Sequence, residues 1–270
     1  MKINDWLNSS TKKLSQNKIS SARLDCLLML EDCLKNNRSL ILAHTENELT
    51  PTQIKTLNIM LKRRLNSEPM VYIRGFIEFY GLKFKVNNKV LIPRPETEDF
   101  INLVLDLDIN NNSNILDVGC GCGAIAISLA KNTEHKIYAS DISLQTLKIA
   151  HINNKTLHAN VKIYKDNLFE NPKTNFDVLT ANLPYVPIKM QKKLQPELSY
   201  EPKIALWQSG DGLGLYKELF QQINEVKNKP TFVLTESLKT QHAKMIVIAK
   251  RYGYSINKTS GLVQVFIKVK

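Results

Sequence analysis

The chain has 270 residues, of which 43% are hydrophobic, so it is long enough to bury the core of one larger domain and one smaller domain. It contains no run of about 18 apolar residues, and its first residues lack the basic-then-apolar layout of a secretory signal. We therefore expect a cytoplasmic protein with no membrane partner. Its four cysteines and five histidines show neither a disulfide framework nor metal-ligand spacing, so we expect no metal site.

The formal net charge is +12, and residues 231–270 hold seven basic residues and one acidic residue. A basic surface favours acidic partners such as RNA or ribosome-associated proteins. However, Lys, Asn and Ile are abundant along the whole chain, as an AT-rich genome would produce. The charge therefore does not require direct binding of nucleic acid.

Residues 1–70 show helical periodicity. Ser20-Ser21 precede one apolar series, and Thr50-Pro51 precede a second as an N-cap and a first-turn proline. The two series are Leu24, Leu27, Leu28 and Leu34, and Ile54, Leu57, Leu61 and Leu65. We predict a small helical bundle, and because it holds no catalytic constellation, we expect it to bind a macromolecular substrate.

Residues 71–92 are rich in β-branched and aromatic side chains, which indicates a β-hairpin that links two domains. Asn87-Asn88 is the expected turn of this hairpin. Leu91–Glu98 then opens a helix, with acidic residues suited to its first turn. A catalytic domain is predicted over residues 93–270.

From about residue 112, strand and helix patterns alternate. The predicted strands are 115–118, 136–140, 161–164, 176–181, 231–235, 254–258 and 262–268, and the predicted helices are 124–130, 143–151, 213–226 and 240–251. Such alternation is typical of a doubly wound parallel sheet, here with a hairpin at its end. The fold class predicted for the whole chain is α/β, a Rossmann-like sheet with an N-terminal helical bundle.

A glycine loop lies between the first of these strands and its helix. Gly119, Gly121 and Gly123 alternate with Cys120 and Cys122, and Asp117 stands two positions ahead. A dinucleotide loop would have the spacing G-x-G-x-x-G. The G-x-G-x-G spacing with a leading carboxylate instead suits a cationic sulfonium that carries an amino acid tail, whose ammonium group Asp117 can bind. The loop therefore predicts S-adenosylmethionine as the cofactor and S-adenosylhomocysteine as the product.

Two further strand ends carry candidate cofactor contacts. Asp141 ends the second strand, where a carboxylate can accept both ribose hydroxyls. Asp166-Asn167 follow the third strand and are expected at the adenine edge. A turn or an N-cap is the ordinary alternative for such residues, and for Asp166 alone that alternative would be preferred.

Asn182-Leu183-Pro184-Tyr185 follow the buried strand 176–181, at the carboxyl edge where open α/β sheets bind ligands. The Asn182 side-chain oxygen and the Leu183 carbonyl can each accept one N–H of a substrate amide. With both hydrogens held, the nitrogen lone pair points at the sulfonium methyl. Tyr185 can stack on the planar group. This tetrad, with Asn182 also next to the cofactor, predicts methyl transfer to an amide or amine nitrogen.

These residues resemble the PrmC (HemK) family of peptide chain release factor glutamine methyltransferases over nearly the whole chain. The resemblance is carried by Tyr72-Ile73-Arg74-Gly75, Glu78-Phe79-Tyr80, Leu91–Glu98, Asp117–Gly123, Asp141, Glu201-Pro202-Lys203 and Ala205-Leu206. It implies a class I methyltransferase domain, an N-terminal helical domain, and transfer to the glutamine of the Gly-Gly-Gln motif in class I release factors. We expect a monomer.

The sequence departs from the family at Leu183, because the family usually has Asn-Pro-Pro-Tyr. The carbonyl of residue 183 is retained, Pro184 still favours an extended conformation for Leu183, and a backbone N–H is gained. We expect retained activity. The alternatives left open are a glutamine methyltransferase of a ribosomal protein, a nucleic-acid amino-group methyltransferase, and a binding protein without turnover.

Overall fold

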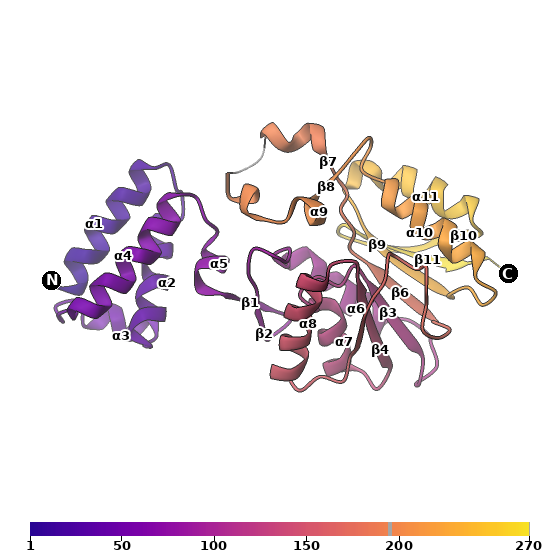
Figure 1. Cartoon of the computed structure of the whole chain (residues 1–270), viewed down its shortest axis with the longest axis horizontal. Helices are drawn as coiled ribbons and strands as arrows, with labels where there is room; N and C mark the ends of the chain where they lie inside the picture. Colours follow the sequence, from indigo (N-terminus) through magenta and orange to yellow (C-terminus); the bar gives the residue numbers. More distant parts are fainter. Residues whose placement is uncertain (194–195, 270) are drawn as a thin grey trace. The chain divides into compact units, whose positions relative to one another are not determined.

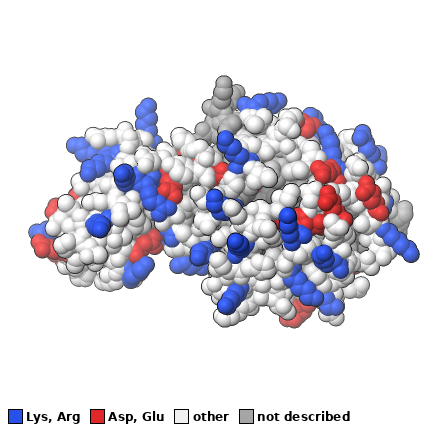
Figure 2. All heavy atoms as spheres, in the orientation of Figure 1, with Lys and Arg blue, Asp and Glu red and all other residues white. Residues whose placement is uncertain are grey.

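The computed structural model describes residues 1–193 and 196–269, which form two compact units (Figure 1). The first unit consists of Met1–Gly75 and Pro196–Tyr200, and the second of residues 76–193 and 201–269. Lys and Arg side chains are scattered over the visible face of both units (Figure 2). The domain boundaries expected from the sequence, 1–70, 71–92 and 93–270, remain a prediction.

The first unit is helical. Its elements are α1 Ile3–Gln16, α2 Ala22–Leu34, α3 Arg38–Ala43, α4 Pro51–Leu65, α5 Met70–Arg74 and the 3-10 turn η3 Pro196–Tyr200. Trp6, Met29 and Leu57 lie in its core, at most 2% exposed. The N-cap predicted at Thr50 is confirmed, and the structure completes it as a capping box with Gln53. Ser21 occupies the N-cap position of α2, but its hydroxyl donates to Asp25 Oδ2 at 2.8 Å and makes no capping hydrogen bond to the helix backbone.

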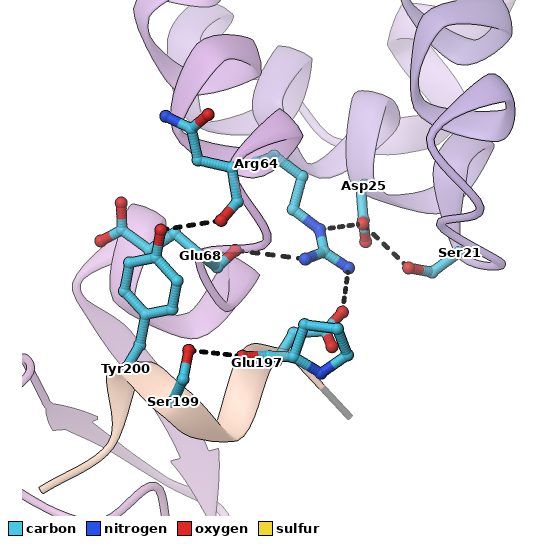
Figure 3. Close-up of polar contacts among 9 residues, drawn as sticks. Ser21, Asp25, Arg64, Glu68, Glu197, Ser199 and Tyr200 are labelled. Carbon is cyan, nitrogen blue, oxygen red and sulfur yellow. Dashed lines mark hydrogen bonds and ion pairs between the residues drawn. The ribbon is translucent and has the colours of Figure 1, made fainter. Parts of the chain in front are cut away.

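A buried arginine organises the polar part of this unit (Figure 3). Arg64 Nε donates to Asp25 Oδ2 at 2.7 Å, and Arg64 Nη2 donates to Glu197 Oε1 at 3.1 Å. Its third nitrogen, Nη1, donates to the carbonyl of Glu68 at 3.2 Å. Tyr200 Oη donates to the carbonyl of Asn66 at 2.7 Å. These bonds attach the distant segment Pro196–Tyr200 to α4.

The second unit is built on a seven-stranded sheet of order β10-β11-β9-β6-β3-β4-β5. Its strands are β3 Asn114–Val118, β4 Lys136–Asp141, β5 Lys162–Lys165, β6 Val178–Ala181, β9 Phe232–Glu236, β10 Tyr254–Ser260 and β11 Val263–Lys268. Strands β5, β4, β3, β6 and β9 are parallel, and β11 runs antiparallel to β9 and to β10. The predicted parallel sheet with a terminal hairpin is confirmed.

Helices cover both faces of the sheet (Figure 1). α6 Asp99–Leu105, α7 Ala124–Asn132 and α8 Leu144–Thr156 form one layer, and α10 Gly214–Glu225 and α11 His242–Arg251 form the other. From β3 the chain proceeds through β4 to β5 on one side, then returns to β6 and β9 on the other. The strand order therefore reverses between β3 and β6, and ligands bind at such a reversal in open α/β sheets. The remaining short elements are η1 Pro95–Glu98, β7 Val186–Pro187, η2 Ile188–Lys193, α9 Lys203–Leu206, β8 Trp207–Gln208 and η4 Lys239–Gln241.

The predicted β-hairpin exists, but its turn was misplaced. β1 Phe76–Phe79 pairs with β2 Leu82–Lys85, so the turn lies at Tyr80-Gly81 and not at Asn87-Asn88. Tyr80 and Gly81 both have positive φ, 48° and 71°, as the tightest two-residue hairpin turns require. The segment before the hairpin, which we expected to be extended, is helix α5.

Candidate active site

A cavity of about 470 Å³ lies at the carboxyl edge of β3, β4, β5 and β6 within the second unit. The predicted site residues that line it are Asp117, Gly119, Cys120, Gly121, Cys122, Asp141, Asp166, Asn167, Asn182, Leu183 and Pro184. The sheet thus brings four separate strand ends to one cavity. Of the remaining two predicted residues, Gly123 is the N-cap residue of α7 and Tyr185 hydrogen-bonds to Glu236.

The glycine loop needs its glycines for two different reasons. Gly119, Gly121 and Gly123 all have positive φ, between 57° and 85°, a region that other residues rarely adopt. In addition, a Cβ on Gly119 would lie 2.9 Å from Leu183 Cδ2. The loop and the tetrad therefore pack directly on each other, so the cofactor loop and the tetrad form a single site.

Asp117 carries an unused hydrogen-bonding atom. Its Oδ1 accepts from the Thr180 hydroxyl at 2.9 Å, whereas its Oδ2 is buried and has no hydrogen-bond partner among the described residues. Burial raises the pKa of Asp117 to about 7, against the lowering effects of the Thr180 bond and of the nearby Ala126 backbone N–H, which does not form a hydrogen bond with Oδ2. A buried carboxylate oxygen without a partner is costly in water-free surroundings, so this atom indicates a cationic ligand group.

Asp141 and Asp166 both lie on the cavity but are engaged differently. Asp141 Oδ2 accepts from Gly121 N at 3.2 Å and its Oδ1 from Ser143 N at 2.9 Å, which ties β4 to the glycine loop. Burial raises the pKa of Asp141. Asp166 accepts from the backbone of Asn167 and Asn171, so its carboxylate shapes the turn after β5. The ribose and adenine contacts stay predictions.

The two loop cysteines are buried, and burial raises the pKa of the Cys120 thiol well above its usual range and that of Cys122 to about 12. Both are therefore protonated near neutral pH and are poor nucleophiles. The described residues contain no group of three or more metal-ligating side chains. Thiol chemistry at this loop is thus suppressed by its own burial.

The buried carboxylate Glu236, which was not predicted from the sequence as a site residue, is hydrogen-bonded to Tyr185 and, through Thr97, to Asn182. Asn182 Nδ2 donates to Thr97 Oγ1 at 3.2 Å, and Thr97 Oγ1 donates to Glu236 Oε2 at 2.8 Å. Tyr185 Oη donates to Glu236 Oε1 at 2.8 Å. Burial raises the pKa of Glu236, and hydrogen bonds from Thr97, Tyr185 and Asn182 oppose that rise. The stacking expected of the Tyr185 ring stays a prediction.

The backbone N–H that Leu183 gains is satisfied. Leu183 N donates to Tyr216 Oη at 3.1 Å, and the single proton of Tyr216 Oη has its shortest contact, 2.6 Å, with the carbonyl of Glu236. The Leu183 carbonyl is 3.4 Å from the same hydroxyl, so it does not compete for that proton and remains an acceptor. Tyr216 thus fixes a tetrad that lacks the first proline.

The sequence contained a signal for Thr97 and for Glu236, although not for Tyr216. Thr97 belongs to the Leu91–Glu98 run, which indicated a helix start and the family resemblance but no site role, and Glu236 ends β9 as Asp141 ends β4. The same run is anchored by Glu201, which accepts from Ile92 N at 3.1 Å and pairs with Arg94. A polar residue at the carboxyl end of a parallel strand is a signal for a ligand site. We considered it for β3, β4, β5 and β6 but not for β9.

The fold and the cavity define a class I methyltransferase. The crystal structure of the hMettl16 catalytic domain in complex with the MAT2A 3′UTR hairpin 1 has the same fold, with a TM-score of 0.57 at 12% identity, over 84% of this chain and 83% of that chain. The methyltransferase small domain family matches residues 101–256, and the PrmC N-terminal domain family matches residues 5–75. Among the described helices, none has the length and apolar character needed to cross a membrane.

Two relatives identify the family more closely. The release factor glutamine methyltransferase of Coxiella burnetii is 35% identical over 92% of this chain and 91% of its own. That of Buchnera aphidicola subsp. Schizaphis graminum is 34% identical over 94% of this chain and 92% of its own. The chain belongs to the PrmC family of release factor glutamine methyltransferases.

Proposed function

We propose that this chain transfers a methyl group from S-adenosylmethionine to the side-chain amide nitrogen of the glutamine in the Gly-Gly-Gln motif of class I release factors. The observation that carries the proposal is the contact between the two halves of the site. Gly119 of the loop packs on Leu183 of the tetrad, and both line one cavity. A sulfonium bound by the loop would therefore lie next to an amide bound by the tetrad.

The residues present fit S-adenosylmethionine. Asp117 Oδ2, the buried atom without a partner, suits the ammonium group of the amino acid tail. Asp141 would accept the ribose hydroxyls with the lone pairs that Gly121 N and Ser143 N leave unused. Asp166 and Asn167 line the part of the cavity expected to hold the adenine. When bound, the cofactor supplies an electrophilic methyl group.

The tetrad would orient the nucleophile. Asn182 Oδ1 and the Leu183 carbonyl each accept one N–H of the glutamine amide, which directs the nitrogen lone pair toward the methyl group. Both acceptors also stabilise the positive charge that develops on the nitrogen. Such alignment, with reacting atoms roughly 3–3.5 Å apart, supplies several kcal/mol without a general base. The S–CH3 bond would break as the N–CH3 bond forms, and the cationic nitrogen would then lose one N–H proton to water.

The family membership favours a release factor over the alternatives. The relatives from Coxiella and Buchnera are named for release factor glutamine methylation. We infer that residues 1–70 bind the release factor, that the enzyme acts in the cytoplasm as a monomer, and that it needs neither membrane nor nucleic acid. A ribosomal protein or a flipped base remains the outcome to consider if no release factor is modified.

The test is transfer of labelled methyl from S-adenosylmethionine to a purified class I release factor, beside a copy whose Gly-Gly-Gln glutamine is alanine. We expect label on the first protein and none on the second. Label on neither, with cofactor binding shown by calorimetry, would reject the proposed substrate. Asn182→Ala is the matched enzyme control, which should bind the cofactor but transfer no methyl.

A further inference from the structure

Glu236 is a carboxylate that the proposed chemistry does not use. It ends β9, its exposed fraction is 1%, and each of its two oxygens has a separate donor. Thr97 Oγ1 lies 2.8 Å from Oε2, and Tyr185 Oη lies 2.8 Å from Oε1. Three segments far apart in the sequence thus meet on one buried group.

The hydrogen-bond chain has a fixed direction. Thr97 Oγ1 donates to Glu236 Oε2 and Tyr185 Oη donates to Glu236 Oε1, so Glu236 accepts at both oxygens and the Thr97 hydroxyl uses its only proton toward it. Toward Asn182, 3.2 Å away, the Thr97 oxygen can then only accept. The side-chain amide of Asn182 has two ends of similar size, Oδ1 and Nδ2. Because Thr97 can only accept from it, the Nδ2 end must face Thr97.

This direction decides what Asn182 offers to the cavity that it lines. With Nδ2 directed at Thr97 and at the Glu236 carboxyl, the oxygen Oδ1 is the end left over, and no described residue donates to it. A flipped amide would instead present N–H groups to the N–H groups of a substrate amide. Donor would then face donor, and the nitrogen lone pair would not be directed at the methyl group.

We propose that Glu236 and Thr97 are positioning residues that lock the Asn182 side-chain amide with its oxygen toward the substrate. The inference rests on the proposed function, because it specifies how the tetrad recognises an amide nitrogen. Neither residue needs to touch the substrate amide. Their effect is to make one of two sterically similar orientations the only one with satisfied hydrogen bonds.

The decisive variants change hydrogen bonding at nearly constant shape. Thr97→Val removes the acceptor for Asn182 Nδ2, and Thr97→Ser keeps the hydroxyl. For Thr97→Val we expect kcat for methyl transfer to fall by about 10²-fold, with the KM for S-adenosylmethionine within about twofold of wild type. For Thr97→Ser we expect rescue, with kcat within about threefold of wild type, because only methyl packing is lost.

Glu236→Gln tests the other end of the chain. Its amide nitrogen can donate to Thr97, which frees the Thr97 proton and permits the flipped Asn182. We expect the same split, a kcat lowered by about 10²-fold with little change in the KM for the cofactor. Equal kcat in wild type, Thr97→Val and Glu236→Gln would overturn the inference. Equal losses in Thr97→Val and Thr97→Ser, together with loss of cofactor affinity, would show a merely structural role and also overturn it.

One measurement needs no change at Thr97 or Glu236. In wild type labelled with nitrogen-15, the side-chain amide protons of Asn182, assigned by their absence in Asn182→Ala, should exchange slowly with water. Rapid exchange would mean that Nδ2 faces the cavity, and the inference would be wrong even if the variants do not fold. If wild type modifies no release factor, the proposed function fails, while the exchange result still decides the orientation.

Discussion

Two groups of largely buried polar side chains, one around Arg64 in the helical unit (the closed cluster) and one at Asp117 and Asn182 in the catalytic unit (the open cluster), differ in how many of their hydrogen-bonding atoms have a partner. In the helical unit, all three Arg64 nitrogens are bonded, to Asp25, Glu197 and the carbonyl of Glu68. In the catalytic unit, Asp117 Oδ2 has no described partner, and Asn182 Oδ1 accepts from no described donor. A cluster whose hydrogen-bonding atoms all have partners contributes to the fold. Atoms without partners beside a cavity instead mark where a ligand can supply the missing hydrogen bonds.

The largest expected effect comes from opening the closed cluster. Arg64→Met leaves Asp25 buried without its cation, so we expect the free energy of unfolding of the helical unit to fall by about 3–5 kcal/mol. Trp6 fluorescence in a Trp207→Phe background would follow that unit in denaturant. Lys62→Met, on the exposed face of the same helix, should change the value by about 0.5 kcal/mol or less. Similar losses in both variants would contradict the assignment.

The next effect comes from neutralising the open cluster. For Asp117→Asn we expect the Kd for S-adenosylmethionine to rise by about 100-fold, because a charge-assisted bond to the ammonium group is lost. Stability without cofactor should not fall, since the variant removes a buried, incompletely paired carboxylate. Asp177→Asn, at the opposite edge of the sheet, is the matched control and should bind the cofactor normally. Unchanged affinity in Asp117→Asn would remove Asp117 from the site.

The pH dependence should follow from the same carboxylate. The pKa of Asp117 is raised from 3.8 to about 7 in the folded chain, so the unfolded state ionises first. Without cofactor, its contribution to stability is therefore present at low pH and is lost as pH rises through that window, by up to about 1.4 kcal/mol per pH unit. Cofactor binding should show the opposite trend and tighten as pH approaches 7. Asp117→Asn should reduce both slopes and leave the part due to Asp141 and Glu236, whose pKa values burial also raises. Unchanged slopes in that variant would show that Asp117 is not their main source.

The smallest effect concerns the Leu183 departure. Tyr216→Phe leaves the buried Leu183 N–H without its hydrogen-bond acceptor. In a Leu183→Pro background that N–H does not exist. A double-mutant cycle on the free energy of unfolding should therefore give a coupling of about 1 kcal/mol. The bond from Tyr216 to the Glu236 carbonyl is lost in both backgrounds and cancels. A coupling near zero would mean that Tyr216 does not support Leu183.

Much of the catalytic unit could be predicted, because a parallel strand of buried residues followed by Asp, Asn or Gly is a local pattern. Asp117, Asp141 and Asn182 were found in this way, and the cavity brings them together. Thr97 and Glu236, by contrast, hydrogen-bond to each other, and their further partners Asn182 and Tyr185 lie far away in the sequence. Their roles depend on three segments meeting in space, which local patterns do not encode.

Two departures from the predictions have physical causes. The hairpin turn was assigned to Asn87-Asn88 on composition, whereas Tyr80-Gly81 adopts the positive φ values of the turn. Ser21 stands at the N-cap of α2, but its hydroxyl bonds to Asp25, which belongs to the Arg64 cluster. For Ser21, a tertiary contact with the Arg64 cluster took the place of the local capping bond.

The most direct test of the account is fragment mass spectrometry of a release factor after incubation with the enzyme and S-adenosylmethionine. We expect a single added methyl group, on the side-chain nitrogen of the Gly-Gly-Gln glutamine, and none when Asn182→Ala replaces the wild-type enzyme. A methyl group on any other atom of the release factor, or one that still appears with Asn182→Ala, would contradict it.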